Sequence, residues 1–93
     1  MARKHRARRR RVLLETKLAE LAALARQLSP SATVEASTLS YEGEAGRVVV
    51  FASSDIAEAE IDRIEAVLND RALAIYEDTG FFIPCAVLDL AAR

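Results

Sequence analysis

Two stretches of this sequence carry apolar side chains at helical spacing, and the β-prone runs lie between or after them. In the first stretch, from Arg11 to Leu28, apolar residues recur every three or four positions, at Leu14, Leu18, Leu21, Ala25 and Leu28. In the second stretch the same spacing joins Ala57, Ile61, Ile64, Leu68, Ala72 and Ile75. Side chains spaced in this way lie on one face of an α-helix. Each predicted helix has an apolar face to bury, and a chain of 93 residues supplies one core for both.

Local signals define the ends of these helices. Ser29-Pro30-Ser31 ends the first, because proline disfavours helical backbone before it and cannot continue the hydrogen-bond ladder. Asp55 and Glu58 have the spacing of a capping box, so we expect the second helix to begin within residues 53–55. Asn69-Asp70 is a weak point, and residues 71–76 fit either a continuing helix or a short strand. We favour the long helix.

Three runs of residues favour strands. Thr33–Tyr41 and Arg47–Phe51 flank a short loop that contains two glycines, which is typical of a β-hairpin. The second run is apolar on both faces, as in a central strand or one paired across a subunit boundary. The third begins at Phe81, where Pro84 leaves two alternatives: an edge strand over residues 81–88, or a strand that ends at Ile83 and is followed by a short helix over residues 85–92. We favour a third strand with a terminal turn.

These elements predict an α+β fold in the order α-β-β-α-β, with a possible short C-terminal helix. Two helices would pack on one face of a small, mainly antiparallel sheet. We expect a basic arm over residues 1–11 and a single α+β domain over residues 12–93.

The charges divide the chain into a basic arm and an acidic body. Seven of the thirteen Lys and Arg residues lie within residues 3–11, where no acid occurs. The other six face all fourteen Asp and Glu in residues 12–93, which gives that part a net charge of −8. At this density of like charge we expect the arm to be extended or frayed, or ordered as a helical extension or against an anionic surface.

The arm is the candidate for nucleic-acid binding. Arg and Lys neutralise phosphates with little dependence on sequence, and the planar guanidinium of Arg bridges phosphate oxygens. The acidic body would be repelled by a polyanion, so contact must be made by the arm. The candidate residues are Arg3, Lys4, Arg6, Arg8, Arg9, Arg10 and Arg11.

No constellation of catalytic or metal-binding residues emerges from the sequence. His5 is the single histidine and lies in the arm, and Cys85 is the single cysteine, in an apolar segment where burial would raise its pKa.

The acids Glu58, Asp62 and Glu65 share a helix face, which is typical of a solvated surface. Residues 43–46 have the letters of the G-x-x-G clamp of KH domains but lie in a predicted hairpin and include Glu44, so we interpret the glycines as turn residues. We expect no cofactor, no metal and no enzymatic activity.

Three hypotheses for function follow. The first is a non-enzymatic module whose arm contacts RNA or DNA phosphates, with the body as scaffold or dimerisation unit. The second is an assembly module, either a homodimer or a subunit of a complex, whose arm contacts an acidic protein surface or solvent; its candidate interface is Leu14, Leu18, Leu21, Val48 and Val50. The third is a small-ligand site lined by Tyr41, Tyr76, Cys85 or the acids. A lone cysteine and the lack of an apolar run long enough to cross a bilayer favour the cytoplasm without membrane contact.

Overall fold

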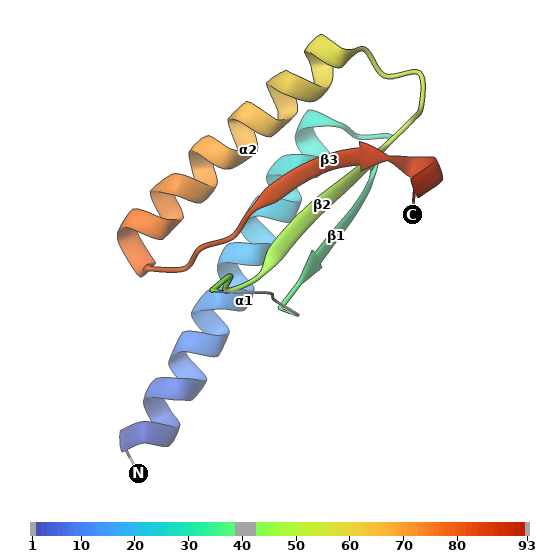
Figure 1. Ribbon diagram of the computed structural model, residues 1–93. Helices are drawn as coiled ribbons and strands as arrows, with labels where there is room; N and C mark the ends of the chain where they lie inside the picture. Colours follow the sequence, from blue (N-terminus) through green and yellow to red (C-terminus); the bar gives the residue numbers. More distant parts are fainter. Residues whose placement is uncertain (1, 39–42, 93) are drawn as a thin grey trace.

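The computed structural model describes residues 2–38 and 43–92 and confirms the α+β fold and the element order (Figure 1). Two helices and three strands follow one another along the chain, and a single turn of 3-10 helix, η1, ends the described part. Their bounds are α1 Ala2–Leu28, β1 Thr33–Ser37, β2 Arg47–Ala52, α2 Glu58–Thr79, β3 Cys85–Asp89 and η1 Leu90–Ala92.

The three strands form one mixed sheet in the order β1-β2-β3. β1 pairs antiparallel with β2, with Glu35 opposite Val49, while β3 pairs parallel with β2, with Val50 opposite Val87. A parallel pair requires a connection that crosses from one end of the sheet to the other, and α2 makes this crossing. The apolar run of β2 is therefore that of a central strand.

Both helices cover the same face of the sheet. Side chains of a strand alternate between its two faces, and those of β2 and β3 that point towards the helices are Val48, Val50, Cys85 and Val87. They form one core with residues from both helices, namely Leu18, Leu21, Ala25, Ile64, Leu68, Ala72 and Ile75. In Figure 1, α1 crosses behind β1 and β2, and α2 lies beside β3.

Helix α1 extends further towards the N-terminus than the apolar spacing predicts. It begins at Ala2 and runs without interruption into the segment that packs on the sheet, so the basic arm is a helical extension. Its end at Leu28, before Ser29 and Pro30, is as predicted. The helix gives the molecule an elongated outline of 52 × 24 × 23 Å.

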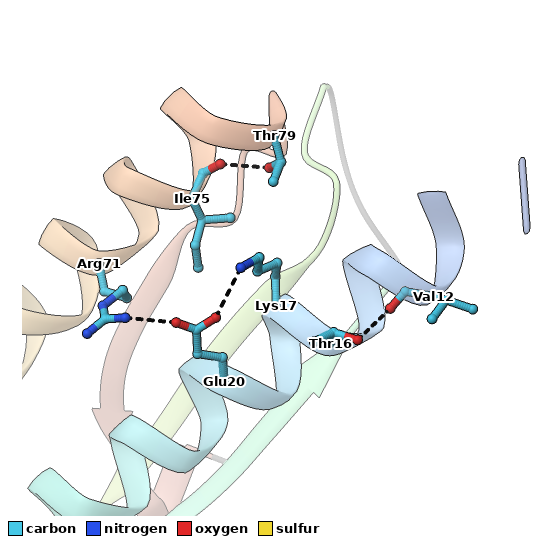
Figure 2. A network of polar contacts seen from close by, with 7 residues as sticks. All are labelled: Val12, Thr16, Lys17, Glu20, Arg71, Ile75 and Thr79. Atoms are coloured by element: carbon cyan, nitrogen blue, oxygen red, sulfur yellow. Dashed lines mark hydrogen bonds and ion pairs between the residues drawn. The ribbon is translucent and has the colours of Figure 1, made fainter. Parts of the chain in front are cut away.

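An ion-pair network joins the two helices. The carboxylate of Glu20 on α1 accepts from the guanidinium of Arg71 on α2 at 2.8 Å and lies 3.5 Å from the Lys17 ammonium. Figure 2 shows Glu20 between these two cations. Because the three side chains are partly exposed, the network contributes little to the stability of the fold.

The second helix begins later than the capping box predicts and runs to Thr79 as the long-helix alternative requires. Asp55 accepts from its neighbour Ser53 instead of capping the helix, whose N-cap is Ala57 without a side-chain hydrogen bond. At the other end Gly80 adopts a left-handed conformation, with φ of 80°, and its N–H donates to the carbonyl of Tyr76. This is a common way to end a helix.

The third strand forms but begins at Cys85, after Pro84, instead of at Phe81. Residues 81–84 are extended beside the hairpin loop, where the N–H of Ala45 donates to the carbonyl of Phe82 at 2.8 Å. Phe81 and Ile83 point into the core while Phe82 points outwards. These three side chains therefore alternate between core and solvent as in a strand, although residues 81–84 form no strand ladder.

The first strand of the hairpin ends at Ser37, and the last residues of its predicted range, Leu39 to Tyr41, lie outside the described residues. Of the two turn glycines, Gly43 has a positive φ of 81° as expected. Gly46 does not, and its role is spatial: a Cβ atom there would lie 2.9 Å from the carbonyl oxygen of Ser37 and 3.1 Å from Leu18. The close approach of the hairpin to α1 therefore requires glycine at position 46.

Side chains of α2 cover the outer edge of β3. Asn69 accepts from the N–H of Cys85 at 3.3 Å and donates to its carbonyl at 3.1 Å, as a neighbouring strand would. The Glu65 carboxylate accepts from the N–H of Val87 at 3.0 Å. The residue that made α2 look weak in the sequence is thus one that attaches α2 to the sheet.

We expect Asn69→Ala to lower the free energy of unfolding by about 1 to 2 kcal/mol, because both backbone groups of Cys85 lose their partner. Urea titration followed by circular dichroism measures this. Asp70→Ala, at an exposed position one residue further along α2, is the matched control and should change stability by no more than about 0.5 kcal/mol. Equal losses for the two variants would contradict this account of the sheet edge.

Candidate nucleic-acid interface

The N-terminal part of α1 projects beyond the sheet and carries exposed arginines. Figure 1 shows these first turns extending past the ends of all three strands. Arg8, Arg9, Arg10 and Arg11 are exposed, and the structure brings them together on consecutive helical positions. The side chains of the other candidate residues, Arg3, Lys4 and Arg6, lie outside the described part of the chain.

The helical conformation distributes the four charges around the helix. Consecutive residues are rotated by about 100° on an α-helix, so four in a row cover the whole circumference. The segment Arg8 to Arg11 therefore has no neutral side, in contrast to an amphipathic helix that lies flat on a charged surface.

A contact with the body fixes the base of the arm. The guanidinium carbon of Arg10 lies 4.7 Å from the centre of the Phe81 ring, a cation–π geometry. Phe81 is buried, and its N–H donates to the Thr79 hydroxyl at 3.1 Å, so the end of α2 positions the ring. Arg10 is therefore partly committed to the fold, while Arg8, Arg9 and Arg11 have no ion pair with any described residue.

Electrostatics disfavour the arm helix in the free chain. The positive end of the helix macrodipole coincides with the positive side chains, and like charges three positions apart, such as Arg8 and Arg11, repel one another. A polyanion beside the arm reverses both effects. The arrangement can therefore hold phosphate groups and gain helical order from them.

The predicted interface residues lie inside the single chain. Leu18, Leu21, Val48 and Val50 are buried in the core, and Leu14 packs against it. Apolar spacing identified residues that must be buried, and in this structure they are buried against one another.

An apolar cleft lies beside the end of α2, and Tyr76, which the small-ligand hypothesis named, is one of its lining residues. Its hollow, of about 710 Å³, is lined in part by Leu73, Tyr76 and Phe82, all about half exposed. The rings of Tyr76 and Phe82 meet edge to face with centres 6.5 Å apart. Leu73 and Tyr76 fall outside the buried spacing of α2, and this signal would have indicated an apolar surface. Tyr41 lies outside the described residues.

Cys85 is buried with a free thiol, and burial raises its pKa to about 11. The raised pKa confirms the expectation from the sequence and suppresses thiolate chemistry.

Among the described residues no group of His, Cys, Asp and Glu is arranged to hold a metal ion. Glu65, one of the three acids considered, instead binds the backbone of β3.

Comparisons with protein-family models, with curated proteins and with solved structures gave no match. Within residues 2–38 and 43–92, neither helix has an apolar stretch of the length that crossing a membrane requires.

We expect iodoacetamide to alkylate Cys85 about 100-fold more slowly in the folded chain than in urea at pH 8, because the pKa moves from 9.0 to about 11. Since the folded pKa is the higher one, this thiol favours the folded state below pH 9, and that contribution is lost as the pH rises towards 11. Mass spectrometry of timed samples gives the rates. Similar rates in both states would show that the thiol is accessible and its pKa unshifted.

Proposed function

We propose that this chain is a non-enzymatic module that binds nucleic acid through the basic N-terminal part of α1, with the α+β body as its scaffold. The observation that carries the proposal is the run of four exposed arginines, Arg8 to Arg11, on a helix that projects from the body. Phosphate contacts of this kind give binding that depends on salt and little on sequence.

The shape of the arm favours a groove of duplex DNA. A helix with its side chains is about 10–12 Å across, which matches the major groove of B-form DNA at about 12 Å. Inside a groove, phosphates flank the helix on both sides, so a helix that is charged all round neutralises both rows. The major groove of A-form RNA is too narrow and deep for side chains to read, so duplex DNA is the preferred ligand.

The charge of the body restricts how the ligand approaches. Helix α2 carries seven acids and two arginines, for a net charge of −5. A polyanion is repelled from that side and attracted to the projecting arm. The body thus orients the ligand without contributing to its affinity.

We expect Arg8→Gln with Arg9→Gln to weaken binding of a labelled DNA duplex, and to reduce the slope of log affinity against log salt by about two. Fluorescence anisotropy over a salt series measures both quantities. The matched control is Arg63→Gln with Arg71→Gln, which removes the same charge from the body and should leave the slope unchanged. Loss of affinity in both variants alike would show a net-charge effect, and no binding by the full chain at low salt would refute the proposal.

We expect duplex DNA to increase the helicity of the full chain at low salt, because phosphates neutralise the repulsion among the arm arginines. Circular dichroism at 222 nm, with the DNA signal subtracted, gives the change. A variant that starts at Val12 keeps the packed part of α1 and should show no gain. No gain by the full chain at saturation would mean that the arm helix is already complete without a ligand.

A further inference from the structure

The two edge strands of the sheet differ in whether other parts of the chain cover their outer backbone groups. The outer edge of β3 is covered by Asn69 and Glu65 of α2. β1 is the other edge strand, and no further strand pairs with it among those that the structure describes. An open strand edge is a template for pairing with another chain.

The register shows which backbone groups face outwards from β1. The N–H of Val48 donates to the carbonyl of Pro84 at 3.1 Å, so Val48, Val50 and Ala52 direct their backbone groups towards β3. The alternate residues of β2 direct theirs towards β1, where they meet Thr33, Glu35 and Ser37. The backbone N–H and C=O groups that face away from the sheet are therefore those of Val34 and Ala36.

A groove runs along this edge, between β1 and one flank of α1. Its hollow of about 680 Å³ is lined on the strand side by residues 34–38 and on the helix side by Glu15, Leu18, Ala19, Ala22 and Arg26. In the middle of this flank Ala19 is exposed and Ala22 is buried, and because neither has a long side chain, a second backbone can approach closely there. Leu18 is buried and forms the floor of the groove.

The charges at the ends of the groove complement one another in an antiparallel copy. Glu15 and Arg26 lie eleven positions apart, three turns of helix, on the same flank as the two alanines. When a second α1 runs in the opposite direction, Glu15 of each copy meets Arg26 of the other, and Ala19 meets Ala22. Glu15 and Arg26 are both exposed, and neither has an ion pair with a described residue.

A single two-fold axis can relate the two α1 helices and the two β1 strands at the same time. On α1 the centre of symmetry lies between Glu20 and Leu21, about 4 Å along the helix from Leu18. Leu18 and the Ser37 carbonyl both lie near Gly46, so they are at the same level of the molecule. Because α1 and β1 run in opposite directions, 4 Å further along α1 corresponds to one residue back along β1, at Ala36. Ala36 is one of the two residues whose backbone groups face outwards.

We infer that the partner of this groove is a second copy of the chain, with the two β1 strands paired antiparallel about Ala36 in a six-stranded sheet. Ala36 then exchanges two backbone hydrogen bonds with Ala36 of the second copy, and Glu15 pairs with Arg26 on both sides of the axis. The antiparallel geometry directs the two basic arms to opposite ends of the dimer and places both acidic α2 helices at the outer edges, so like charges stay apart. This inference does not depend on the proposed binding of nucleic acid.

Charge reversal tests the pairing. We expect Glu15→Arg alone and Arg26→Glu alone each to raise the dissociation constant of the dimer roughly tenfold, because like charges then meet at both ends of the groove. The double variant restores complementary pairs, and so does a one-to-one mixture of the two single variants, which forms a heterodimer. Sedimentation equilibrium over a concentration series, without nucleic acid, gives the constants, and circular dichroism checks the fold.

Two further variants distinguish this interface from others. Ala36→Pro removes an N–H that faces away from β2, so the fold is retained and the dimer is weakened. Leu88→Lys changes the opposite face of the sheet, where Leu88 is exposed, and leaves the dimer unaffected. A wild-type chain that stays monomeric at millimolar concentration, an effect of Leu88→Lys instead of the groove variants, or failure of the mixture to recover would each overturn the inference.

Discussion

The other elements of the fold depend on the burial of Val48 and Val50 in the central strand. Both side chains are completely buried between β2 and the two helices. β2 also supplies the hydrogen bonds of both neighbouring strands, one antiparallel and one parallel. The parallel pair requires the long crossover, and the 22 residues of α2, about 33 Å, exceed the length of any strand in the sheet. Residues 80–84 therefore connect α2 to β3 as an extended segment beside the hairpin loop, and this brings Phe81 to the base of the arm.

Different interactions stabilise the packed part of helix α1 and its basic arm. Burial of Leu18 and Leu21 contributes about 1.5–3 kcal/mol for each side chain, which far exceeds the helix propensities involved. In the arm the described body contact is the stacking of Arg10 on Phe81, of the order of 0.5–2 kcal/mol, against repulsion of about 0.2–0.5 kcal/mol for each like-charged pair. The two opposing contributions are of similar size. The arm therefore responds to its ionic surroundings, which is the physical basis of the proposed function.

The sequence predicts those features of the fold that depend on periodicity. Its predictions are wrong where a contact between residues far apart in the chain determines the structure. The apolar spacing and the break at Pro30 were sufficient to place the packed part of α1 and the buried face of α2, although α2 begins at Glu58, later than predicted. Periodicity does not distinguish a core from a subunit interface, so Leu18 and Val48 were predicted to lie at an interface. Asn69 was interpreted as a weak point of the second helix. The local sequence does not show that Asn69 binds Cys85, sixteen residues away. The start of β3 was misplaced for the same reason, since the carbonyl of Phe82 is bound by the hairpin loop instead of a strand.

The helices differ in how they meet the edges of the sheet, and the difference is one of side-chain length. From α2, the longer polar side chains of Glu65 and Asn69 reach over the edge of β3 and occupy its backbone groups. From α1, the flank above β1 carries Ala19 and Ala22, which are too short to do the same. A monomer gains solubility when both of its edges are covered, as α2 does for β3. An alanine flank beside an open strand, with opposite charges at its two ends, has instead the features that pairing with a second copy requires.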